Sequence, residues 1–310
     1  MKRIFATALC AVLLLSALAC GAANEDNGKP TVVCTIFPQY DFVRRIAGDR
    51  VNLVMLAKPG SEVHGFDPSL REMAEILNCD LLIYVGGETD QWVSDLLETN
   101  GKDLNAVALI DLCETVDEEH KEGMQGKAED EPEADEHVWT SPRNAIRIVD
   151  GLTEALCALL PDEADAMRKN ASAYVKELEA LDTDLHAVMQ NAKRHTVVFA
   201  ERFPFRYLCE ELGLDYYAAL PGCSSNEEVA LSTMSFLIDR VKELALPGVF
   251  VIEFSDGRIA HTIAEATGCE VWLLHSCHNV SKADFEAGVT YLDLMRQNIE
   301  SIKKAVESWH

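Results

Sequence analysis

The chain has 310 residues, of which 48% are hydrophobic, so it can form two domains of ordinary size, each with a buried core. Its formal net charge of −25 at pH 7 argues against nucleic acids and anionic membrane surfaces as partners, and it favours cations. The ten cysteines contain no CxxC pair, which argues against a thiolate zinc knuckle. Several of them lie in or beside apolar runs, where buried thiols explain them as well as disulfides do.

The N-terminus predicts export. Lys2 and Arg3 precede an apolar run, and Ala17-Leu18-Ala19 forms a small-residue cleavage site before Cys20. Residues 1–19 therefore read as a signal peptide, and nothing later approaches the roughly 20 apolar residues that a membrane span needs. One interpretation is ordinary cleavage with an incidental cysteine. Residues 16–20 also resemble a bacterial lipobox, so we expect a lipid on Cys20, a tether over residues 20–30, and an extracytoplasmic protein anchored to the cell membrane.

The mature chain alternates strand-like and helix-like runs. Short apolar runs rich in β-branched residues predict strands at 31–37, 51–57, 81–85 and 106–112, with helices at 40–46, 69–78 and 90–98. The pattern restarts later, with strands at 196–200, 216–220, 249–254 and 270–274 and helices at 205–212, 228–244, 258–266 and 289–308. Uninterrupted apolar strands alternating with helices indicate parallel sheets covered on both faces.

Two segments interrupt this alternation. Residues 114–136 are rich in Asp and Glu and predict a flexible acidic loop, which serves either as a solvated insertion or as a loose collector of cations beside a site. A helix at 145–160 is followed by a helical pattern that runs to about Arg194 without Gly or Pro. We therefore expect an α/β fold of two lobes, residues 31–160 and 195–310, joined by one long helix at 161–194.

Two loop histidines, far apart in sequence, predict a metal site. His64 lies between Pro59-Gly60 and Asp67-Pro68-Ser69, and His137 directly precedes a helix that Pro142 can open. Loops at the carboxyl ends of parallel strands are where such sheets bind ligands. Glu201 and His275 also fall just after predicted strands, and His278 follows three residues later.

The chain resembles the metal-binding lipoproteins of bacterial ABC importers for zinc and manganese, in particular the zinc branch. The resemblance rests on Pro-Gly-x-Glu-x-His-x-Phe-x-Pro-Ser around His64, on His-Val-Trp-x-Ser-Pro-x-Asn-Ala from His137, on the acidic loop with its histidine, and on the long helix. It implies two four-stranded parallel lobes joined by one backbone helix, with the metal between them. It also implies a monomer that delivers a divalent metal to a membrane permease.

The ligand set implied by the resemblance is His64 and His137 from the N-lobe and two residues from the C-lobe. The third family position falls on Arg202, which cannot bind a cation, and Glu201 is one residue away. His275 occupies the fourth position. We therefore expect His64, His137 and His275 as core ligands, with Glu201, His278 or water completing the tetrahedron.

Further residues are assigned around this site. His120, Glu118 and Glu119 of the acidic loop are expected to capture additional metal, and Glu62 is expected to hydrogen-bond the His64 ring or its neighbourhood. Neutral imidazoles suit zinc, whereas carboxylate-rich sites suit manganese, so Zn²⁺ is the expected metal and Mn²⁺ the alternative. A zinc hydrolase is disfavoured because the sequence has no HExxH, Gly-x-Ser-x-Gly or Walker motif. A surface adhesin of the same family remains an alternative that could coexist with transport.

Overall fold

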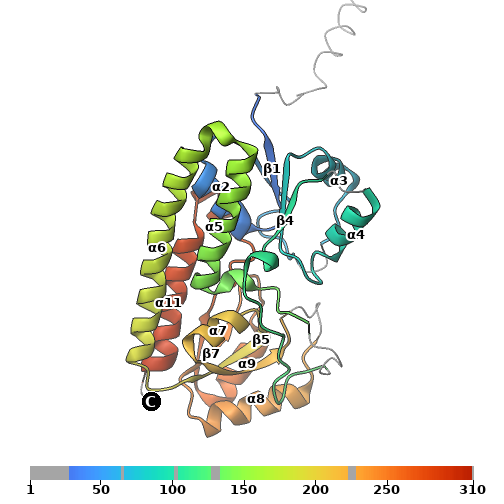
Figure 1. The fold of residues 1–310 in the computed structure, drawn as a ribbon. Helices are drawn as coiled ribbons and strands as arrows, with labels where there is room; N and C mark the ends of the chain where they lie inside the picture. The colour runs from blue at the N-terminus through green and yellow to red at the C-terminus, as the bar shows by residue number, and fades with distance from the viewer. Residues whose placement is uncertain (1–27, 64–65, 101–103, 127–132, 223–227, 309–310) are drawn as a thin grey trace, which may run out of the picture.

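The computed structural model describes residues 28–63, 66–100, 104–126, 133–222 and 228–308, and its ribbon is drawn in Figure 1. The predicted signal peptide, Cys20 and His64 lie outside the described residues. No helix in the described part of the chain combines the length and apolar character required to cross a bilayer. The predicted α/β fold of two parallel lobes joined by a long helix is confirmed.

The N-lobe is a four-stranded parallel sheet of order β2-β1-β3-β4. Its strands are β1 Thr31–Cys34, β2 Asn52–Met55, β3 Leu81–Tyr84 and β4 Ala106–Ala108, and its helices are α2 Phe37–Ala47, α3 Leu70–Leu77 and α4 Gln91–Asn100. The strand predicted at 106–112 is therefore too long, because a 3₁₀ turn, η1 Ile110–Leu112, follows β4.

The C-lobe repeats this arrangement in the order β6-β5-β7-β8, again all parallel. Its strands are β5 Thr196–Arg202, β6 Asp215–Leu220, β7 Gly248–Val251 and β8 Glu270–Leu273, and its helices are α7 Arg206–Leu212, α8 Leu231–Glu243 and α9 Arg258–Thr267. A short helix, α10 Lys282–Ala287, was not predicted. Ser281 caps it by accepting the Asp284 N–H, and Gly288 ends it in the left-handed region.

Helix α6 Ala164–Gln190 packs against two other long helices, α5 Pro142–Leu159 and α11 Tyr291–Glu307, and α6 and α11 extend along both lobes (Figure 1). The 27 residues of α6 span about 40 Å at 1.5 Å per residue. It begins after a 3₁₀ turn, η3 Pro161–Glu163, and ends four residues before the predicted boundary at Arg194. Ser141, whose side chain accepts the Asn144 N–H, and Pro142 in the first turn start α5 immediately after His137.

The prediction that the acidic segment is a flexible loop is wrong for residues 114–126, which pack on the C-lobe. Met124 is buried, and Lys121 forms a 2.9 Å ion pair with Asp215. Gln125 donates its backbone N–H to the Ala219 carbonyl of β6 and accepts the Ala230 N–H with its side chain. The acidic composition of the segment gave no indication of these contacts, because Lys121, Met124 and Gln125 lie in its middle and carry no negative charge.

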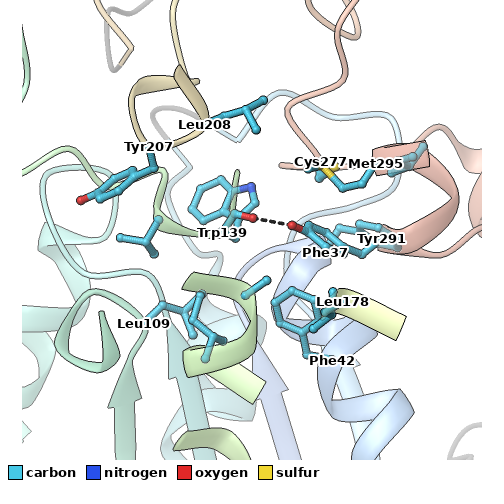
Figure 2. Close-up of a cluster of buried hydrophobic side chains, with 14 of the residues drawn as sticks. Phe37, Phe42, Leu109, Trp139, Leu178, Tyr207, Leu208, Cys277, Tyr291 and Met295 are labelled. Atoms are coloured by element: carbon cyan, nitrogen blue, oxygen red, sulfur yellow. Dashed lines mark hydrogen bonds between the residues drawn. The ribbon is translucent and has the colours of Figure 1, made fainter. Parts of the chain in front are cut away.

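The two lobes are joined by more than α6. The loop after β8 donates from the Asn279 side chain to the carbonyls of Lys58 and Ser61 in the N-lobe, each at 2.8 Å. One hydrophobic core also extends through both lobes, and Figure 2 shows its centre, where the Tyr291 hydroxyl donates to the Trp139 carbonyl at 2.7 Å. These contacts oppose large rotation of one lobe against the other.

We therefore expect the radius of gyration to change little when metal binds. Small-angle X-ray scattering of the metal-free and zinc-loaded protein should give nearly superimposable curves, because closure by hinge rotation would break the shared core. A clear decrease in the radius of gyration on loading would contradict this rigid joint.

Candidate metal centre

His137 lies at the boundary between the acidic segment and α5. It precedes a 3₁₀ turn, η2 Val138–Thr140, in which both the backbone N–H and the hydroxyl of Thr140 donate to the His137 carbonyl. The whole residue is buried, with no exposed surface. The short turn thus holds a histidine side chain inside the protein at a position that no regular helix or strand occupies.

Asp135 fixes the orientation of the His137 ring. Its Oδ1 atom accepts the His137 backbone N–H at 2.8 Å and lies 3.2 Å from the ring Nδ1. A proton on Nδ1 satisfies this carboxylate and leaves Nε2 as the atom with a lone pair, an arrangement common for histidine ligands of metals. Burial disfavours the imidazolium, but the charges of Asp135, Glu136 and Glu118 prevail and raise the pKa of His137.

The ring of His278 lies against the ring of His137. The two ring centroids are 5.7 Å apart, and the ring planes are nearly perpendicular. The Trp139 ring contacts both imidazoles, with centroid distances of 4.9 Å to His278 and 5.5 Å to His137. Two imidazoles that share a tetrahedral zinc through Zn–N bonds of about 2.0–2.1 Å place their centroids roughly 5 Å apart. The pair therefore has a spacing close to that of two ligands of one metal ion.

A small cavity of about 20 Å³ adjoins this pair. His278 and Gly222 line it from the C-lobe, and Ser61, Glu62 and Val63 line it from the N-lobe. His64 follows Val63 directly but lies outside the described residues. Gly222 also touches the His137 ring, because a Cβ added there would be 3.0 Å from the ring Cε1. Segments of both lobes thus converge on the histidine pair.

His275 has other partners. Its backbone N–H and carbonyl are both held by the side chain of Asn298 on α11, and its ring Nδ1 accepts the Cys277 N–H at 2.9 Å. A neutral imidazole that accepts through Nδ1 carries its proton on Nε2, so this arrangement offers no lone pair to a metal. The contacts described here favour His278 over His275, the reverse of the expected ranking.

Glu201 and Arg202 diverge at the end of β5. The Glu201 carboxylate accepts a hydrogen bond from Ser255, and burial raises the pKa of Glu201. With Ser255 and Asp256, it lines a larger cavity of about 810 Å³. Arg202 instead crosses to the N-lobe and donates to Glu62 at 2.6 Å. Glu62 thus has a described partner other than the expected histidine.

The residues predicted to capture additional metal are held in the packed acidic segment. The Glu119 carboxylate lies 3.4 Å from Lys121, 3.9 Å from Arg206 and 3.3 Å from the Tyr216 hydroxyl. Glu118 donates its N–H to the Glu133 carbonyl where the two arms of the segment pair, and His120 is half-buried. Glu119 is therefore already neutralised by cationic side chains.

Another group of potential ligands lies between α6 and α7. Ligand atoms of Asp182, His186 and Glu211 are within 4.8 Å of one another. Burial and the nearby Asp182 raise the pKa of Glu211 to about 7. However, the Arg143 guanidinium lies 3.1 Å from His186 Nε2, 3.5 Å from Asp182 and 3.6 Å from Glu211. An arginine thus already supplies the positive charge at this cluster.

Sequence reasoning missed two residues that shape the His137 environment. Asp135 was counted only as one acid among many, although its position two residues before His137 is compatible with a local side-chain hydrogen bond to the backbone. Gly222 follows β6 and gave no signal, because its role depends on a Cβ being absent beside a ring from the other lobe. A search for sequence motifs of metal ligands would find neither Asp135 nor Gly222.

Comparison with known proteins identifies the family of the chain. Residues 32–305 match the family model described as zinc-uptake complex component A, periplasmic. The zinc-binding lipoprotein AdcA of Streptococcus pneumoniae is 29% identical over 99% of this chain, which spans 62% of the length of AdcA. The high-affinity zinc uptake system protein ZnuA of Bacillus subtilis is 27% identical, with 92% of this chain and 90% of ZnuA covered.

Solved structures match the fold. The zinc-bound ZnuA-like domain of S. pneumoniae AdcA superimposes with a TM-score of 0.77 at 27% identity, covering 91% of this chain and all of that domain. The periplasmic zinc-binding protein TroA of Treponema pallidum shares the fold, with a TM-score of 0.76 at 24% identity over 90% of this chain and 99% of TroA. The family match extends over nearly the whole described chain and both lobes, and the chain belongs to the family of periplasmic zinc-uptake component A proteins.

Proposed function

We propose that this protein binds zinc outside the cytoplasm and delivers it to the permease of an ABC importer. The observation that carries the proposal is the buried His137–His278 pair, whose spacing suits one shared metal ion and whose flanking segments come from both lobes. The family match and the zinc-binding names of the relatives agree with it. The protein acts as a carrier, and no catalytic step is assigned to it.

His64, His137 and His278 form the proposed core of the site. Val63 is buried at the cavity that His278 lines, so the chain reaches the histidine pair immediately before His64. Asp135 orients the His137 ring through Nδ1, an arrangement common among metal-binding histidines. A set of three imidazoles suits zinc better than manganese, which prefers oxygen ligands. Zinc is the substrate, and Mn²⁺ is the alternative that competition experiments distinguish.

The anchor is part of the same proposal. A lipid on Cys20 would keep the carrier at the membrane, beside its permease, with residues 20–30 as a tether. The relatives in S. pneumoniae are named lipoproteins. Metabolic labelling with a fatty-acid analogue, compared between the native chain and Cys20→Ala, tests this anchor independently of metal binding.

The test of the metal site is zinc stoichiometry. Purified without chelator, the mature protein should contain one tightly bound zinc, and His137→Ala should weaken zinc binding by about 100-fold or more, since loss of outer-shell partners alone costs 10–100-fold. Competition with a chromogenic chelator measures both values, and repeating it with Mn²⁺ tests the alternative metal. The matched control is His261→Ala, because His261 is exposed on α9. Unchanged zinc titration of His137→Ala would exclude this site.

A further inference from the structure

An ion pair connects the two lobes across the cavity that adjoins the histidine pair. Arg202, the last residue of β5, donates from Nη2 to Oε2 of Glu62, which follows β2 in the N-lobe, at 2.6 Å. The Arg202 side chain is only 15% exposed and that of Glu62 is 39% exposed. The other oxygen of Glu62 accepts the Val63 N–H at 3.0 Å, so both carboxylate oxygens are held. Such a charge-assisted, partly buried contact fixes the two loops relative to each other.

The local backbone directs Arg202 into this position. The pairing of β5 with β6 shifts register between Phe199 and Arg202, so β5 carries one additional residue there. A bulge of this kind redirects the side chains that follow it. At the same strand end, Glu201 turns to Ser255, and Arg202 turns to the other lobe.

Two cavities share a wall made of Ile252, Glu253, Phe254 and the ion pair of Glu62 and Arg202. Both residues of the ion pair line the small cavity that His278 and Gly222 also line, and both line the 810 Å³ cavity. The larger cavity is open to solvent, because Arg258 and Phe254 in its wall are exposed. It is also acidic, with carboxylates from Glu62, Glu201, Glu228, Glu253 and Asp256 against two arginines. A cation is therefore attracted to the large cavity, whereas His278 lines only the small one.

We propose that the Glu62–Arg202 ion pair is a clasp between the lobes that controls the exchange of metal between the solvent-exposed acidic cavity and the buried histidine pair. This inference rests on the proposed function. The pair neutralises the arginine charge close to the metal, and its separation opens the shared wall of the two cavities. Metal release therefore requires a local break between two side chains and no rotation of the lobes.

The clasp predicts how the rate of zinc release responds to substitution. Glu62→Gln and Arg202→Gln should each release zinc about tenfold faster, because residues in one ion pair are coupled by energies of this order. The Glu62→Gln/Arg202→Gln double variant should be no faster than the faster single variant, since both substitutions break the same contact. The rates are measured by mixing zinc-loaded protein with an excess of a fluorescent chelator in a stopped-flow instrument.

Arg258→Gln is the matched control. Arg258 lines the same large cavity with the same charge, but its carboxylate partner is Asp256 on its own loop. It should release zinc at the native rate. If Glu62→Gln and Arg202→Gln changed the rate of zinc release in opposite directions and their effects added in the double variant, the clasp hypothesis would be wrong. Such a result would mean that each side chain acts on the metal only through its own charge. The hypothesis would also be wrong if Arg258→Gln accelerated zinc release as much as Glu62→Gln and Arg202→Gln do.

Failure of the clasp and failure of the proposed function are distinguishable. If the native protein holds one zinc and the release rates of the variants do not change, only the clasp is wrong. If the native protein does not hold zinc, the proposed function is wrong.

Discussion

His278→Asn is expected to weaken zinc binding by about 100-fold or more, whereas His275→Asn is expected to retain affinity within about threefold of the native protein. The two histidines are three residues apart in one loop, and both are buried. They differ in what their rings face. His278 lies 5.7 Å from His137 between ring centroids, while His275 uses its Nδ1 to accept the Cys277 N–H.

Asparagine suits this comparison because its side-chain oxygen can replace an imidazole Nδ1 as an acceptor. In His275→Asn the contact with the Cys277 N–H can persist, so the loop should keep its conformation. In His278→Asn an imidazole that contacts both Trp139 and His137 is lost. Chelator competition gives the zinc affinity of each variant, and thermal unfolding of the metal-free proteins checks that both remain folded. Strong loss in His275→Asn with native affinity in His278→Asn would restore the ranking expected from the sequence.

Much of the fold could be predicted because parallel lobes leave a simple pattern in the sequence. Each buried strand is a short apolar run, and each helix between strands has a period near 3.6, so all eight strands and the long helix were found. The boundaries of the elements were harder to predict. The strand at 106–112 was overextended because the residues of β4 and of the following 3₁₀ turn are equally apolar, and only the hydrogen bonds of β4 with β3 separate them.

The acidic segment shows where composition fails. Its net charge predicted an unpacked loop, yet residues 114–126 lie on the C-lobe because of three side chains, Lys121, Met124 and Gln125. Each pairs with a partner about 90 or more positions later in the chain or packs in the shared core. A sequence read locally contains no information about those partners.

The relative positions of the two C-lobe histidine rings could not be predicted for a related reason. Position after a strand predicted that His275 and His278 both lie near the site, but position cannot say which ring faces His137. Asn298, 23 residues later on α11, holds the backbone of His275. Cys277 has a φ of 62°, in the left-handed region, so the chain turns sharply between the two histidines. Tertiary contacts and one unusual backbone angle therefore determine which of the two histidine rings faces His137.

Zinc affinity should fall steeply with pH, beginning at a higher pH than an ordinary histidine would give. His137 must be neutral to bind metal, and the neighbouring carboxylates raise its pKa above the ordinary value of 6.5. Protons therefore compete with zinc already above pH 6.5, and each imidazole ligand that must lose a proton costs about tenfold in affinity per pH unit below its pKa. Between pH 7.5 and 5.5 we expect a loss of at least about 100-fold.

The stability of the metal-free protein should respond to the same group in the opposite sense. Because the folded-state pKa of His137 is raised, the contribution of this residue to stability is fully present below its unfolded pKa of 6.5 and is lost as pH rises through the folded value. For this group alone, the free energy of unfolding of the metal-free protein therefore rises as the pH falls from 8 to 6. The additional stability that a fixed concentration of zinc confers shrinks over the same range.

Asp135→Asn separates the charge of this carboxylate from its hydrogen bonds. The amide oxygen can still accept the His137 N–H, but the largest of the charges that raise the pKa of His137 is gone. We expect the His137 pKa, followed by NMR of the ring, to fall, and the pH at which zinc binding is half lost to move down with it. At a pH well above the pKa of His137, where protons no longer compete, affinity should instead be about 10- to 100-fold weaker, because the carboxylate makes the ring a stronger ligand. Asp184→Asn, an exposed acid on α6, is the control and should change neither value. An unchanged pH profile in Asp135→Asn would show that Asp135 does not set the protonation of the metal site.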